Sequence, residues 1–191
     1  MVFRSGREKR LWFAAGLCIV LIYSSLYVAR PVANFLRDQN LLRLMVALAF
    51  LSTGGLVVWR LLVGGVGWRV MGTVSAIAAG YLLLLTSIPM MPEERLHFLE
   101  YGVVAALIYL ALRERRVQFA ASGTDSADIL VRLQPFATAL VLTGIFGWID
   151  EGIQALLPNR FYDIRDVSFN AAAAFACLAS LKLVEWARQH E

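Results

Sequence analysis

Residues 41–63 read LLRLMVALAFLSTGGLVVWRLLV, an apolar run long enough for a helix to cross about 30 Å of hydrocarbon. Residues 11–29, LWFAAGLCIVLIYSSLYVA, form a second run of this kind. Open sheet edges do not survive in lipid, and the alternating pattern of a β-barrel is absent from both runs. The two runs therefore predict membrane-spanning helices.

Composition extends this prediction to the whole chain. The 191 residues are 59% hydrophobic and 17% charged, whereas soluble domains average about 45–50% apolar and about 25% charged residues. A soluble fold of this length would lack the polar surface to cover its core. We expect an all-α, polytopic integral membrane helix bundle with about six transmembrane helices. The predicted spans are 11–29, 41–63, 68–90, 96–112, 135–157 and 168–187.

The basic residues indicate an orientation. The net charge of +4 would also suit a nucleic-acid binder, but Lys and Arg gather between the apolar runs, at residues 4–10 and in a loop expected at 113–116. Basic loops remain on the cytoplasmic side of a membrane. We therefore expect cytoplasmic N- and C-termini, a lipid bilayer as the surroundings and no nucleic-acid partner.

Two segments carry polar residues at the expected outer ends of the spans, 92–102 (PEERLHFLEYG) and 148–174. Charged groups at membrane depth are costly and normally face a protein interior or a water-filled cavity. Residues four apart share one face of a helix, and this spacing recurs in both segments. The spacing predicts one outward-facing polar pocket. Its candidate ligand-binding residues are His97, Tyr101, Asp150, Glu151, Gln154, Arg160, Asp166 and Asn170.

The mixture of side chains in this pocket limits what it can bind. Carboxylates, amides, one imidazole and one guanidinium suit a hydrated cation, a phosphate bridged by a metal or by Arg160, or a sugar or peptide head group. No cofactor is evident, although the carboxylates are compatible with a divalent cation. The sequence assigns no catalytic residues and no metal ligands.

Structural interpretations of the same residues stay open beside the functional one. Asp163 and Asp166 suit the start of the last helix, as its N-cap and as an acid in its first turn. His97 suits a structural histidine that holds two helices together. The polar residues at 150–160 suit a network that only stabilises the mouth of the bundle.

The two polar segments resemble those of the VanZ-like family, named after a membrane protein associated with teicoplanin resistance. A Lys that the family usually has shortly before the residue matching His97 is absent here, and Ala173 stands where the family usually has a Gly. The resemblance is carried by His97, Phe98 and Tyr101 in the first segment and by Asp150, Glu151, Gln154, Pro158, Arg160, Asp166 and Asn170 in the second.

The resemblance covers residues 70–187 and implies a VanZ-like four-helix core, bounded here as 67–191, after an N-terminal helical pair at 1–66. It implies a multi-pass protein of the bacterial inner (cytoplasmic) membrane with a place in the cell envelope. Some family members are linked to reduced susceptibility to glycopeptide antibiotics. The resemblance names no molecular activity.

Three functions fit these observations. We favour a binding or accessory protein whose outer pocket recognises the head group of an envelope lipid, glycan or peptide. The first alternative is a membrane enzyme that acts on a lipid-linked substrate at the outer leaflet, since carboxylates and a His can carry acid–base chemistry. The second is a small structural subunit of a membrane protein complex.

Overall fold

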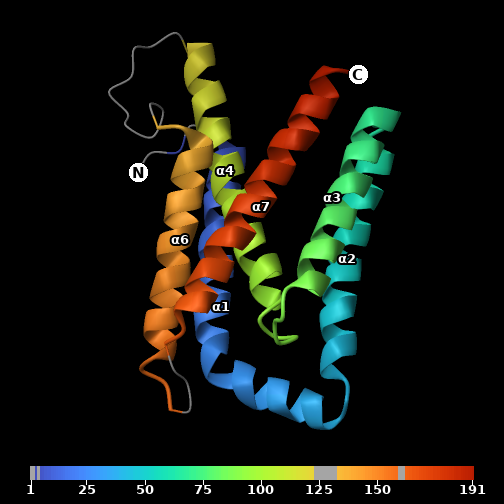
Figure 1. Ribbon diagram of the computed structural model, residues 1–191. Helices are drawn as coiled ribbons and strands as arrows, with labels where there is room; N and C mark the ends of the chain where they lie inside the picture. The colour runs from blue at the N-terminus through green and yellow to red at the C-terminus, as the bar shows by residue number, and fades with distance from the viewer. Residues whose placement is uncertain (1–2, 4, 123–132, 159–161) are drawn as a thin grey trace.

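The computed structural model of the chain is helical (Figure 1). It describes residues 3, 5–122, 133–158 and 162–191. Six of its helices are long and apolar enough to cross a membrane, which confirms the prediction of an all-α membrane bundle. They are α1 (Gly6–Asp38), α2 (Leu42–Val63), α3 (Trp68–Ser87), α4 (Leu96–Ser122), α6 (Pro135–Gln154) and α7 (Ile164–Gln189).

Helix α4 lies at the centre of the packing. It contacts α1, α6 and α7 extensively, whereas α3 packs against α7, and α2 contacts α1 only lightly. The fully buried Ile108 and Leu112 of α4 and Leu178 of α7 belong to one hydrophobic core. The division at residue 66 concerns the family resemblance and stays a prediction. In the packing, α1 contacts α4 extensively and α6 lightly.

A proline shapes the long first helix. Ser5 caps it, because the Ser5 hydroxyl accepts a hydrogen bond from the Glu8 N–H, a pattern that starts helices. Pro31 lies inside α1, where it removes one backbone hydrogen bond and allows a bend. Figure 1 shows the last part of α1 turning across the end of the bundle toward α2. The predicted span, 11–29, lies within the part of α1 that precedes Pro31.

Both of the next connections use a left-handed residue. Asn40 has φ 58°, and the Leu41 N–H donates to the Leu36 carbonyl at 2.8 Å. Gly65 has φ 63°, and its N–H donates to the Leu62 carbonyl at 3.1 Å. This geometry ends helices and satisfies their last carbonyls. The Gly-rich stretch 64–67 is therefore the connection between α2 and α3.

The fourth helix is longer than its predicted span, 96–112, because α4 continues to Ser122. The loop expected at 113–116 was wrong, since these residues are helical. A charged residue remains in a packed helix when its charge is paired. Here the Arg115 Nη1 donates to the Glu8 Oε1 of α1 at 2.7 Å, and both side chains are buried.

The two ends of the bundle differ in what they bring together. The N- and C-termini lie at one end (Figure 1). The beginning of α4, the end of α6 and the beginning of α7 meet at the opposite end. Both predicted polar segments therefore lie at the end away from the termini. Which side of a membrane this end faces stays a prediction from the basic residues.

Candidate functional site

Helix α6 turns its small and polar residues inward and its large apolar residues outward. Val141, Ile145 and Trp148 are exposed, as expected of a helix whose outer face contacts lipid. A membrane helix that buries polar groups places them against other protein groups or water. Its buried residues are Ala139, Thr143, Gly147, Asp150, Glu151 and Gln154.

Glu151 is fully buried, and hydrogen bonds orient both of its carboxylate oxygens. The Gln154 side-chain amide donates to Oε1 at 2.8 Å, and the backbone N–H of Asp163 donates to Oε2 at 3.3 Å. The spacing of four residues predicted that Asp150 and Gln154 share one face with Glu151 beside them, and all three are buried on α6. The first turn of α7 and the last turn of α6 thus hold this carboxylate in place.

Asp150 faces α4. The Tyr101 hydroxyl donates to the Asp150 Oδ2 at 2.6 Å, and both residues are almost completely buried, with 1% exposure for Tyr101 and 0% for Asp150. A hydrogen bond to a charged acceptor is shorter and stronger than one between neutral groups. Asp150 and Tyr101 therefore connect α6 to α4 beside Glu151.

One turn deeper, α6 and α7 approach closely at Gly147. The Asn170 side-chain amide donates to the Gly147 carbonyl at 3.4 Å, and Asn170 is fully buried. A Cβ atom on residue 147 would lie 2.7 Å from the Asn170 Cβ. Glycine at 147 therefore sets the spacing of the two helices below Glu151 and Asp166.

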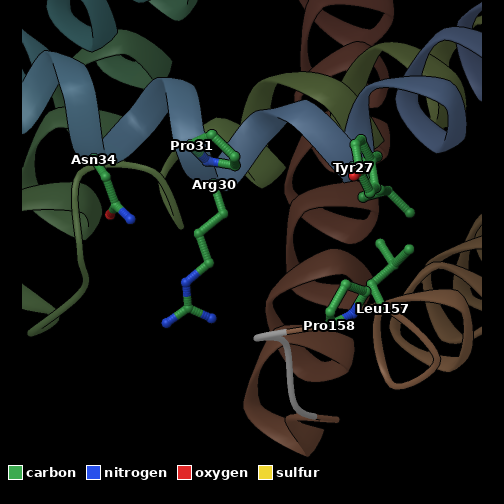
Figure 2. Close-up of a pocket in the computed structure, with 7 residues that line it drawn as sticks. Tyr27, Arg30, Pro31, Asn34, Leu157 and Pro158 are labelled. Carbon is green, nitrogen blue, oxygen red and sulfur yellow. The ribbon is translucent and has the colours of Figure 1, made fainter.

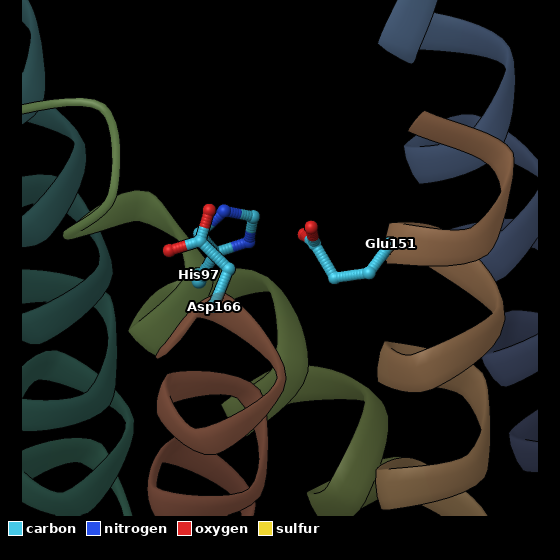
Figure 3. A group of neighbouring side chains, drawn as sticks. All are labelled: His97, Glu151 and Asp166. Atoms are coloured by element: carbon cyan, nitrogen blue, oxygen red, sulfur yellow. The ribbon is translucent and has the colours of Figure 1, made fainter. Parts of the chain in front are cut away.

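Three potential metal ligands converge from three helices. His97 of α4, Glu151 of α6 and Asp166 of α7 each place one ligand atom within 4.8 Å of the others. Figure 3 shows Glu151 extending from α6 toward His97 and Asp166, which lie next to each other. The His97 Nδ1 also lies 3.8 Å from the Glu100 Oε2.

The structure brings the predicted site residues together except for Arg160, which lies outside the described residues. We call the group the polar cluster. The N-cap interpretation of Asp163 is confirmed, because its side chain accepts a hydrogen bond from the Arg165 N–H at 2.8 Å. The described members of the polar cluster are His97, Tyr101, Asp150, Glu151, Gln154, Asp166 and Asn170.

A cavity of about 430 Å³ opens at the same end of the bundle, between the bend of α1 and the segment after α6. Figure 2 shows Arg30 and Asn34 of α1 on one side and Leu157 and Pro158 on the other. The described members of the polar cluster do not line it. Within the described chain, the predicted residues therefore form a buried cluster, and this cavity is lined by other residues.

Sequence reasoning missed Thr143 and Gly147. Both lie on the buried face of α6, and the steps from 143 to 147 to 151 each span four residues. This spacing was the available signal, because it continues the face of Glu151 deeper into the bundle. It was overlooked because neither residue carries a charge.

No protein-family model matches the chain, and neither a curated protein nor a solved structure matches it.

Proposed function

We propose that this chain is a VanZ-like protein of the bacterial inner membrane that binds the head group of an envelope lipid, glycan or peptide at the polar cluster. The orientation expected from the basic residues places the cluster on the outer side. The observation that carries the proposal is the complete burial of Asp150 and Glu151 within a helix whose other face is apolar.

The energetic cost of this burial supports a binding role. An ionisable group in a membrane protein is costly, and such groups usually mark a functional site. Asp150 and Glu151 are adjacent, so two carboxylates share this cost. A phenol, an amide and a backbone N–H are among the groups that orient them. A polar head group that donates hydrogen bonds or carries a cation complements them.

The cavity at the same end of the bundle, which the described polar cluster does not line, offers space for a further part of such a ligand. Its volume of about 430 Å³ lies within the range of about 300–1,000 Å³ that is typical of ligand pockets. Leu26, Tyr27 and Leu157 supply apolar contacts, and Arg30 supplies a guanidinium that suits a phosphate or carboxylate. An amphiphilic ligand matches this lining.

Thermal unfolding in a mild detergent tests the proposal. Short-chain phospholipids, an amino sugar and a short peptide serve as probes. A probe at about 100 times its Kd stabilises the folded protein by about 2.7 kcal/mol. We expect such a shift for at least one probe in the wild type, and its loss in Asp150→Asn and Glu151→Gln.

Glu185→Gln is the matched control. Glu185 is also an acid in a helix, but it lies near the other end of α7, where it accepts hydrogen bonds from Tyr109, Arg113 and Lys182. The probe should still stabilise this variant. If no probe stabilises the wild type, or if the site variants respond as the wild type does, the polar cluster is a structural network and the proposal is wrong.

One observation favours the enzyme alternative. His97 lies within 4.8 Å of the carboxylates of Glu151 and Asp166, and an imidazole beside carboxylates is able to move protons in hydrolysis or group transfer. A substrate would be a lipid-linked molecule of the outer leaflet. This alternative would be favoured over binding alone if the wild type forms product and the folded His97→Gln variant does not.

Another observation favours the structural-subunit alternative. Helix α2 has only two buried residues, Leu42 and Val46, and its contacts with α1 are few. A membrane partner would find a long apolar helix face there. Co-purification in a gentle detergent tests this alternative, and a monomer without partners would contradict it.

A further inference from the structure

We infer that His97, Glu151 and Asp166 form a divalent-cation site with one open coordination position for an anionic oxygen of the head group. The cation site depends only on these three side chains. The assignment of the open position rests on the proposed function, because it requires a head group to bind here.

The distances suit a site that closes around an ion. Zinc lies about 2.0–2.2 Å from nitrogen and oxygen ligands, so two ligands of a tetrahedral ion are about 3.5 Å apart. The three ligand atoms here lie within 4.8 Å of one another. A side-chain rotation that moves one or two atoms by about 1 Å closes this difference. The residues come from α4, α6 and α7, so the ion would connect three helices.

Hydrogen bonds already orient Glu151 for this role. Its two oxygens accept from the Gln154 amide and the Asp163 N–H, and each retains a second lone pair. Carboxylates that bind metals are usually held by outer hydrogen bonds of this type. Glu151 therefore loses little side-chain freedom when an ion binds.

His97 has a carboxylate beside its ring. The Nδ1 atom lies 3.8 Å from the Glu100 Oε2, and Glu100 follows His97 by three residues on the same face of α4. A metal-binding His normally donates its other ring N–H to a carboxylate, carbonyl or water. We assign Glu100 the role of a positioning residue that orients the ring when His97 binds the ion.

Charge also favours a cation. Glu151 and Asp166 bring two negative charges together, and Glu151 is fully buried. A buried charge is stabilised by a counter-charge or by a metal. A divalent cation is attracted by both carboxylates, and a neutral imidazole of His97 is its third ligand.

The ligand set indicates which ions bind. Imidazole suits zinc, and carboxylates suit manganese and magnesium. One imidazole and two carboxylates therefore favour Mn²⁺ or Zn²⁺ over Ca²⁺, which takes six to eight oxygen ligands. Three protein ligands also leave a position for water or a substrate oxygen, as in catalytic zinc sites. A phosphate or carboxylate oxygen of the head group would take this position.

The first test measures the effect of the ion alone on the full chain in detergent. MnCl₂ and ZnCl₂ should raise the unfolding temperature of the wild type after treatment with EDTA. The shift should disappear in His97→Gln and Asp166→Asn. The matched control is His190→Gln, which removes the other histidine at the far end of α7, where its Nδ1 lies 2.8 Å from the Trp186 carbonyl.

A second measurement keeps the test decisive if a variant fails to fold. Binding of Mn²⁺ to the wild type removes the electron paramagnetic resonance signal of the free ion, and we expect one bound ion per chain. A wild type that neither binds Mn²⁺ nor gains stability from either ion overturns the inference. A shift that His97→Gln and Asp166→Asn retain also overturns it.

The head-group probes separate this inference from the proposed function. A probe that stabilises the EDTA-treated wild type as strongly as the metal-loaded protein contradicts the assignment of the open position, while the proposed function stands. An ion that binds without any probe binding contradicts the proposed function, while the cation site stands. A phosphate probe that binds only with Mn²⁺ or Zn²⁺ supports both.

Discussion

Replacement of Gly147 by Ala should separate α6 from α7. A Cβ atom at residue 147 would lie 2.7 Å from the Asn170 Cβ and 3.0 Å from its Nδ2, whereas carbon atoms pack best at about 3.5–4.0 Å. The nearest atom is a Cβ, which moves only with the backbone of α7. Asn170 is fully buried, so it cannot rotate away into open space.

The size of the effect follows from these contacts. Overpacking of this kind costs about 1–3 kcal/mol, and the displaced Asn170 amide loses its hydrogen bond to the Gly147 carbonyl, worth about 0.5–1.5 kcal/mol. Alanine in a helix regains about 1 kcal/mol relative to glycine. We expect a net destabilisation of about 1–3 kcal/mol.

Gly144→Ala is the matched control, because no atom lies within 4 Å of a Cβ at that position. The helix-propensity gain is the same in both variants, so their difference in stability isolates the contact with Asn170. Unfolding in mixed micelles, followed by far-UV circular dichroism, measures both. Equal stabilities of Gly147→Ala and Gly144→Ala would refute the close approach.

Two further predictions concern buried hydrogen bonds and charges. Tyr101→Phe removes the donor to the Asp150 carboxylate and should lower the free energy of unfolding by about 1.5–3 kcal/mol. Tyr23→Phe loses a hydrogen bond to a backbone carbonyl and should lower it by about 0.5–1.5 kcal/mol. Equal losses of stability in the same unfolding measurement would contradict this. Glu8→Gln and Arg115→Met should each cost about 3–5 kcal/mol, because each leaves a buried charge without its partner. The double variant should cost clearly less than the sum, and a double-mutant cycle with no coupling energy would refute the pairing.

The membrane spans were predictable because polar groups are costly in lipid, so each span is a long apolar run in the sequence. The boundaries at 41–63 and 68 agree with α2 and the start of α3 within a residue. The end of α4 was not predictable from local composition. The run at 113–116 looks like a polar loop, but Arg115 continues the helix because Glu8, 107 positions earlier, neutralises it.

The polar cluster was predictable in its members but not in its contacts. Residues four apart share one face of a helix, so His97 and Tyr101 were expected on one face of α4. Their neighbours differ, however. His97 lies close to Glu151 and Asp166, whereas Tyr101 donates a hydrogen bond to Asp150. Spacing along one helix cannot give the register between helices. That register depends on the close approach of α6 and α7 at Gly147, which the four-residue spacing from Thr143 to Glu151 indicates only along α6.

The groups that contact acidic side chains differ between the two ends of the bundle, and this difference bears on function. Near the termini, Glu8 meets Arg115, and Glu185 meets Arg113 and Lys182, so cationic side chains neutralise each acid. At the other end, the Tyr101 hydroxyl donates to Asp150, and the Gln154 amide and the Asp163 N–H donate to Glu151. Neutral donors orient a carboxylate without cancelling its charge. Glu151 is both the carboxylate that these donors orient and one of the three side chains that converge with His97 and Asp166, so the ion titration and the head-group probes test the same residues and belong in one experiment.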